Sequence, residues 1–154
     1  MCSSDLLVAR LAQAEAAAWG EAVHVYPEAL PLLRELRQRG LRLGLISNCS
    51  CQAGAVVSAI GLRELMDAVV LSCELGVAKP DPAIFRHACR QLGVTPERAM
   101  FVADGAFREL EAASDLGMVA VKIEQPHQSG DYGTSERFHH RITNLREVPG
   151  LLED

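Results

Sequence analysis

The 154-residue sequence lacks several features that define whole classes of protein. No apolar run approaches the ~18 residues that a membrane-spanning helix needs. No cluster of lysine and arginine stands out against a formal net charge of -5, which argues against nucleic acid or an anionic membrane surface as a partner. The first residues also lack the basic region of a signal peptide. We therefore expect neither a membrane nor a nucleic-acid partner.

Cysteine is present, but not in a pattern that indicates a metal site or a disulfide framework. The number is odd, and the only short spacing, between Cys49 and Cys51, has no second pair to complete a zinc site. The five positions are Cys2, Cys49, Cys51, Cys73 and Cys89. Reduced thiols in a cytoplasmic protein are the simplest interpretation.

What the chain does contain is typical of one globular α/β domain. Apolar residues make up 49% and charged residues 23%, which excludes disorder. Helical and strand-like segments alternate, which favours a mostly parallel sheet between two layers of helices. We predict strands over 41–46, 68–71, 99–103 and 119–123, a polar loop over 125–138 and a short closing segment over 145–152.

The predicted helices have recognisable starts, stops and apolar faces. An Ala-rich helix covers 5–19, and others occupy 51–60 and the segment after Asp104. The face predicted to be buried contains Leu30, Leu33 and Leu36 in the helix opened by Pro27 and ended by Gly40. The buried face predicted for the helix that Asp81 caps contains Ile84, Phe85, Ala88 and Leu92. The buried face predicted for the helix after Asp104 contains Phe107, Leu110 and Ala113.

Polar residues follow three of the predicted strands, at the sheet edge where open α/β folds bind ligands. Ser47 and Asn48 follow the first strand, Lys79 follows the second, and Asp104 ends the third, with Glu109 five residues later. Taken singly, each has an ordinary alternative: a helix cap for Ser47, Asn48 or Asp104, and a solvated surface residue for Lys79 or Glu109. Their order at successive strand ends is much more specific.

Together these groups suit a phosphoryl ligand. A hydroxyl and a backbone N–H can bind its oxygens, and a lysine can offset the charge that accumulates during transfer. One carboxylate can hold Mg²⁺, and a second can hold one of the waters that Mg²⁺ keeps.

Three stretches of the sequence, taken together, resemble the haloacid dehalogenase superfamily. Residues 43–48 resemble its second motif, a strand ending in Ser or Thr, and 76–85 resemble its lysine motif. Residues 101–118 resemble its acidic fourth motif, with Glu109 where Asp is more frequent and Ala103 where Gly is usual. The resemblance implies a Rossmann-like three-layer α/β/α core over 25–154 and a remnant of a helical cap over 1–24.

The resemblance also implies roles. Ser47 and Lys79 would act in catalysis and bind the substrate's phosphoryl group, assisted by the backbone N–H of Asn48. Asp104 and Glu109 would hold Mg²⁺. Dehalogenases of the family usually lack an acid at the position of Asp104, so the resemblance favours hydrolysis of a small phosphorylated metabolite.

The family's first motif, Asp-x-Asp at the end of a central strand, has no counterpart here. None of the seven aspartates has a second aspartate two residues later. The family's nucleophile and general acid–base are therefore missing, and the sheet should have a gap between the strands that end at Ser47 and near Asp104. We expect a truncated chain, with a second copy or a partner segment completing the sheet, or the N-terminal segment packed in the gap, as alternatives.

Two further functions remain open at this stage. The missing nucleophile is compatible with a non-catalytic module that binds phosphate or a partner. Asp104 could instead accept a phosphoryl group, as in a response-regulator receiver, although the lysine of such a site should follow the acceptor strand and Lys79 precedes it.

Overall fold

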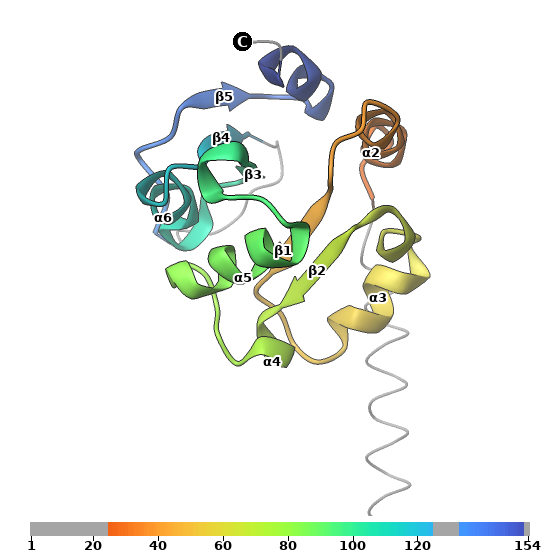
Figure 1. The fold of residues 1–154 in the computed structure, drawn as a ribbon, viewed down its shortest axis with the longest axis horizontal. Helices are drawn as coiled ribbons and strands as arrows, with labels where there is room; N and C mark the ends of the chain where they lie inside the picture. Colours follow the sequence, from red (N-terminus) through yellow and green to blue (C-terminus); the bar gives the residue numbers. More distant parts are fainter. Residues whose placement is uncertain (1–24, 125–132, 153–154) are drawn as a thin grey trace, which may run out of the picture.

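The computed structural model describes residues 25–124 and 133–152 (Figure 1). The helix predicted over 5–19 and the cap remnant predicted over 1–24 lie outside this part of the chain. The α-helices are α2 (Ala29–Gln38), α3 (Ala53–Ala59), α4 (Ser72–Leu75), α5 (Pro82–Leu92) and α6 (Glu109–Asp115). The strands are β1 (Gly44–Ser47), β2 (Ala68–Leu71), β3 (Met100–Ala103), β4 (Val119–Ile123) and β5 (His140–Ile142). The 3₁₀ segments are η1 (Arg63–Leu65), η2 (Pro96–Arg98), η3 (Ala106–Arg108) and η4 (Leu145–Leu152).

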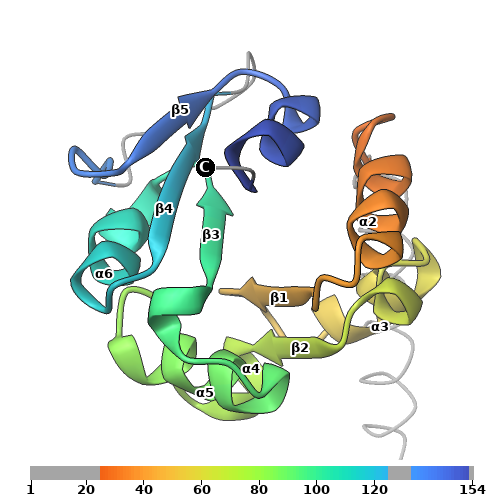
Figure 2. The same cartoon turned by 45° about the horizontal axis from the view of Figure 1, so that its top comes forward.

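The strands form two separate parallel sheets. In the first, β1 pairs with β2 so that Ser47 lies opposite Leu71. In the second, β4 lies between β3 and β5. Figure 2 shows β1 and β3 next to each other but turned to different directions. Among the described strands no ladder joins the two sheets, and the division falls where the sequence predicts a gap.

Two apolar clusters, on opposite faces of the strands, make the three-layer α/β/α arrangement. The first contains buried residues of β2, α5, β3, α6 and β4, among them Phe85, Phe101 and Leu110. Phe85 and Phe101 form an edge-to-face pair with ring centroids 5.1 Å apart. The second cluster joins α2 to β4, β5 and η4 and includes Leu36 and Val121. The first cluster draws on both sheets, so side-chain packing holds them together.

Helix α5 begins and ends as its sequence predicts. The carboxylate of Asp81 accepts a hydrogen bond from the backbone N–H of Ala83 at 2.8 Å, and Pro82 occupies the first turn. Gly93 ends the helix in the left-handed conformation, with φ of 64°. This start fixes the position of the loop that carries Lys79.

Several local predictions were wrong because tertiary contacts decided the outcome. Strand β5 falls where no strand was predicted. Phe107 is 48% exposed and has φ of 55°, so it does not lie on the buried face of α6. On α5 the fourth buried position is Cys89 instead of Leu92, and on α2 Leu32 is buried with Leu36.

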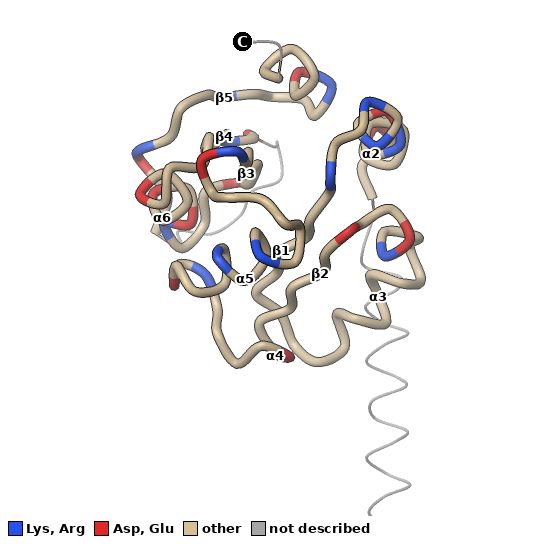
Figure 3. The backbone as a smooth tube through the Cα atoms, in the orientation of Figure 1, with Lys and Arg blue, Asp and Glu red and all other residues tan. Residues whose placement is uncertain are grey.

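Charged residues of both signs are interspersed along α2 and around α6 (Figure 3). Within the described ranges, no helix combines the length and the apolar character needed to cross a membrane.

Candidate functional site

The loop between α4 and α5 places Lys79 between the two sheets. Its ammonium Nζ lies 2.6 Å from Oε2 of Glu109, the first residue of α6, and donates a hydrogen bond to the carbonyl of Ile46 on β1 at 3.3 Å. The same Nζ lies 5.7 Å from the centre of the Phe101 ring. The Lys79 and Glu109 side chains are only 13% and 5% exposed. Lys79 therefore links β1 to the start of α6, through a hydrogen bond to Ile46 and a nearly buried ion pair with Glu109.

Asn48 fixes the backbone of Lys79. Its side-chain oxygen accepts from the Lys79 N–H at 2.8 Å, and its amide nitrogen donates to the Lys79 carbonyl at 2.8 Å. These reciprocal bonds hold the loop after β1 against the loop before α5. The sequence indicated only a backbone role for Asn48, so this side-chain role was missed.

Ser47 and Asp104 stand at the carboxyl ends of their strands, as predicted. Ser47 is the last residue of β1, next to the Ile46 carbonyl that Lys79 binds, and its hydroxyl makes no hydrogen bond within the described residues. Asp104 is exposed, follows β3 directly and accepts from the N–H of Ala106 at 3.0 Å. Both residues thus lie at the carboxyl ends of the strands, where the Lys79 ammonium also lies.

The pKa of Glu109 is changed by its burial and by the neighbouring charges of Lys79 and Asp104. Burial raises the pKa of the Glu109 carboxyl, the positive charge of Lys79 lowers it, and the charge and hydrogen bond of Asp104 raise it again, with burial as the largest effect. The net pKa is above the ordinary value for glutamate. Lys79, Glu109 and Asp104 therefore form one electrostatic group with two carboxylates and one ammonium.

The structure excludes the ordinary roles suggested for most of these residues taken singly. Lys79 and Glu109 are paired and largely buried, so neither is a solvated surface residue. The residue before α3 is Gln52, so neither Ser47 nor Asn48 caps that helix. Asp104 does cap a turn, because its Oδ1 accepts from the Ala106 N–H.

Asp104 and Glu109 are the two carboxylates that the sequence predicts to hold Mg²⁺. Mg²⁺ is commonly bound by one or two carboxylates, with substrate phosphate and water filling its other positions. Asp104 and Glu109 fit that donor set. Burial is the main cause of the raised pKa of Glu109, and the neighbouring charge of Asp104 adds to it. Among the described residues, no cluster of three or more His, Cys, Asp or Glu side chains could hold a metal.

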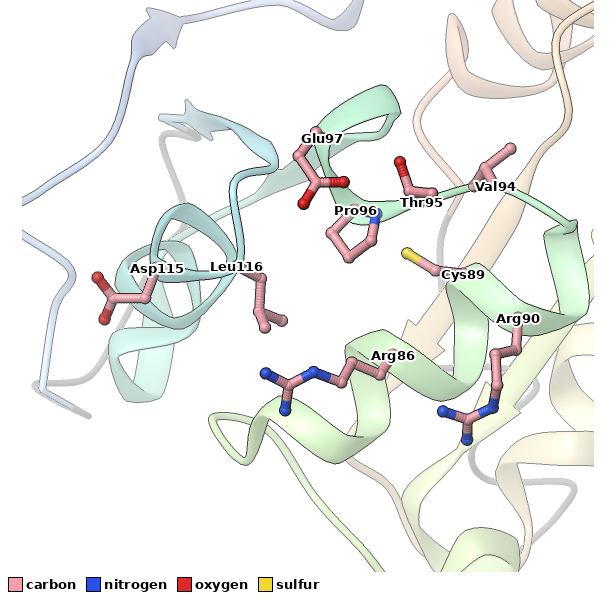
Figure 4. Close-up of a pocket in the computed structure, with 9 residues that line it drawn as sticks. All are labelled: Arg86, Cys89, Arg90, Val94, Thr95, Pro96, Glu97, Asp115 and Leu116. Atoms are coloured by element: carbon pink, nitrogen blue, oxygen red, sulfur yellow. The ribbon is translucent and has the colours of Figure 1, made fainter.

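A pocket of about 450 Å³ lies elsewhere, beside the C-terminal halves of α5 and α6 (Figure 4). It is open, and its lining contains none of Ser47, Asn48, Lys79, Asp104 and Glu109. Its lining consists of Arg86, Cys89, Arg90, Val94, Thr95, Pro96, Glu97, Asp115 and Leu116. The lining combines two arginines with two acids, so its charge is mixed.

Fold and geometry define a parallel α/β protein with a lysine, an asparagine clamp and paired carboxylates at the carboxyl ends of its strands. The model of the haloacid dehalogenase-like hydrolase family matches residues 4–117, and the chain belongs to that family.

Named relatives include phosphatases. The chain is 38% identical to a glyceraldehyde 3-phosphate phosphatase of Methanopyrus kandleri over 101 residues, 65% of this chain and 43% of that protein. It is 37% identical to a phosphoserine phosphatase of Thermus thermophilus over 126 residues, 80% of this chain and 49% of that protein. Haloacid dehalogenases are also among the similar proteins. The comparisons therefore support a hydrolase, with phosphatases and dehalogenases both represented.

Solved structures agree on the fold. A phosphatase of the same superfamily from Thermococcus onnurineus superposes with a TM-score of 0.76 at 28% identity, covering 88% of this chain and 61% of that one. The chain spans about half the length of the curated relatives described above.

Proposed function

We propose that this chain carries the phosphate-binding and Mg²⁺-binding part of a hydrolase that cleaves phosphoric monoesters of small metabolites. The observation that carries the proposal is the Lys79–Glu109 pair at 2.6 Å beside Asp104, with Asn48 holding the Lys79 backbone. An ammonium among strand-end groups favours an anion, and two carboxylates favour a cation that bridges to it.

Each residue has a distinct task in this proposal. The Ser47 hydroxyl and the Lys79 ammonium bind phosphoryl oxygens, and the Asn48 clamp orients Lys79 toward them. Asp104 and Glu109 bind Mg²⁺, which neutralises phosphoryl charge when bound. The ammonium of Lys79 favours the carboxylate form of Glu109 and so opposes the effect of burial on the pKa of that carboxyl.

The proposal includes a limit on activity. The 154 residues contain no Asp-x-Asp pair, so no aspartate of this sequence matches the family's nucleophile. We expect the chain alone to bind phosphate without hydrolysing esters. Turnover would need an aspartate carboxylate supplied by another segment or by a partner that completes the sheet between β1 and β3.

A binding assay with an internal control tests the site. Calorimetry should show that the chain binds inorganic phosphate in the presence of Mg²⁺, and that Lys79→Met lowers the affinity at least about tenfold. Lys122 is the only other lysine. It pairs with Ala103 in the sheet, and its ammonium lies 5.7 Å from the centre of the Phe138 ring. Lys122→Met should leave the affinity unchanged. Equal losses in both variants, or no phosphate binding by the unmodified chain, would refute the assignment.

An activity assay separates the two candidate functions. Glyceraldehyde 3-phosphate and phosphoserine, which the names of two relatives suggest, are the first esters to test with Mg²⁺. The missing aspartate pair favours the alternative, a non-catalytic phosphate- or partner-binding module. Sustained phosphate release by this chain alone would exclude that alternative and would also contradict the expected inactivity.

A further inference from the structure

Two cysteines that the proposed function does not use lie in contact beside the strand ends. The Sγ atoms of Cys49 and Cys73 are 3.9 Å apart, although the residues are 24 positions apart in the sequence. Cys49 lies in the loop after β1, and Cys73 is the second residue of α4, directly after β2. The parallel pairing of β1 with β2 brings these two loops together.

The backbone around the two thiols is held in place by Ser72. Its hydroxyl oxygen accepts from the Cys49 N–H at 3.0 Å, and the hydroxyl lies 3.5 Å from the Cys49 carbonyl, to which it donates. The contact between the sulfurs therefore rests on fixed backbone on both sides. Disulfide formation then needs the two sulfurs to move from 3.9 Å to a bonding distance of about 2.05 Å.

The remaining thiols in the described part of the chain are placed differently. Cys89 is buried in the first apolar cluster, with 3% of its surface exposed. Cys51 is exposed and close enough to Cys73 to influence its charge, but no sulfur contact joins them. Loss of surrounding water, then the hydrogen bond and charge of Cys49, raise the pKa of the Cys73 thiol. The structure thus distinguishes one pair among these four cysteines.

We propose that Cys49 and Cys73 form a reversible disulfide when the protein meets a small-molecule disulfide such as oxidised glutathione. The exposed Cys73 thiolate attacks one glutathione sulfur, so a mixed disulfide forms and one glutathione thiolate leaves. The Cys49 thiolate then attacks the Cys73 sulfur, the mixed disulfide breaks, and the second glutathione leaves. The protein loses two protons and two electrons, and the oxidant is reduced to two thiols.

The link would tie together the two loops that carry the candidate site. Cys49 directly follows Asn48, and Cys73 lies in the helix that leads to Lys79. Oxidation therefore constrains the β1 loop against the α4 turn by a covalent bond in addition to the Ser72 hydrogen bonds. The disulfide is independent of the proposed function, because its formation requires neither phosphate nor Mg²⁺.

Thiol counting on the full chain tests the assignment. The variant Cys2→Ser/Cys51→Ser retains Cys49, Cys73 and Cys89. After exposure to oxidised glutathione in mildly alkaline buffer and subsequent denaturation, its free thiols should fall from three to one, and a reductant should restore three. Mass spectrometry of the non-reduced digest should join the peptides of Cys49 and Cys73. In the same background, Cys73→Ser should form no internal link.

In the wild-type chain, Cys51 can compete with Cys49 for a disulfide with Cys73. The Cys49–Cys73 link should dominate over any link to Cys51. Three free thiols after oxidation, glutathione retained on both cysteines, a dominant link to Cys51 or Cys89, or a disulfide between two chains would each overturn the assignment.

Discussion

Strands β1 and β4 differ in how completely they are buried, although both belong to parallel sheets. In β4, which has a neighbour on each side, Ala120, Val121 and Ile123 are buried. In β1, which pairs only with β2, no residue is buried. Strand β2 also has one paired edge, yet Ala68, Val70 and Leu71 are buried, so the exposed part of the smaller sheet is β1. The smaller sheet therefore depends on contacts with the rest of the molecule.

The contacts between the two sheets are of two kinds, apolar packing and a buried ion pair. Helix α5 packs on β1 and β2, and its Phe85 reaches Phe101 of β3. Lys79 supplies the polar connection, from Ile46 to Glu109. Apolar packing and this polar link thus connect the two sheets, between which the described strands form no hydrogen-bonded ladder. Each kind of contact can be tested by its own substitution.

Removing the apolar connection should have the largest effect. Phe85 is fully buried, so Phe85→Ala should lower the free energy of unfolding by about 3–5 kcal/mol through lost burial and a cavity. Chemical denaturation measures the loss. Phe107→Ala, at a half-exposed phenylalanine, should cost much less, about 1 kcal/mol or under. Similar costs for the two variants would mean that the first cluster does not join the sheets.

Removing the polar connection should cost about 3 kcal/mol near neutral pH. Lys79→Met leaves the buried Glu109 carboxylate without its cation. Denaturation of the single variant measures this cost, and the double variant Lys79→Met/Glu109→Leu should recover most of it. A double variant as unstable as the single one would show that the pair itself is not the cause.

The pH dependence of that cost has a defined sign. The pKa of Glu109 is higher in the folded than in the unfolded chain, so its contribution to stability is present below the unfolded pKa and is lost as pH rises through the folded pKa. A protonated Glu109 needs no cation, so wild type and Lys79→Met should converge in acid and diverge as pH rises. Denaturation midpoints across pH measure this, and Glu109→Gln should remove the divergence.

Loosening only the smaller sheet should have a smaller and local effect. Asn48→Ala removes both hydrogen bonds to the Lys79 backbone and should cost about 1–2 kcal/mol. Amide hydrogen exchange should accelerate in β1 and β2 and stay unchanged in β4. Asn48→Asp, which keeps the acceptor for the Lys79 N–H, should cost less. Uniform acceleration in both sheets would contradict the local role.

The smallest effect should come from the start of α5. Asp81→Ala removes the cap to Ala83 and should cost about 1 kcal/mol, whereas Asp81→Asn should cost little because its side-chain oxygen still accepts. Thermal unfolding measures both. A larger loss would show that the Asp81 side chain supports the Lys79 loop as well as the helix.

Local sequence signals predicted the elements that carry their own start and stop. The bounds of β2 and β4 and the start of α5 were predicted as found, because apolar runs and the Asp81–Pro82 cap are local features. Strand β5 was missed because His140–Ile142 has one apolar residue, and its pairing with β4 is a tertiary effect. The position of Phe107 was wrong because a residue with positive φ leaves no periodic signal.

The sequence indicated which residues make up the candidate site, but not the contacts among them. Residue order at the strand ends indicated Ser47, Lys79, Asp104 and Glu109. The ion pair between Lys79 and Glu109 and the clamp by Asn48 depend on how two loops from different sheets meet. No spacing in one sequence encodes that distance.

The place of α5 in the chain has a consequence for biosynthesis. Residues 82–92 leave the ribosome after β1 and β2 but before β3. Helix α5 can therefore pack on the first sheet before Phe101, the partner of Phe85, has been synthesised. Until Phe101 and Leu110 emerge, this side of α5 presents uncovered apolar surface on the nascent chain. That interval is when a chaperone would find a binding segment that the finished protein no longer offers.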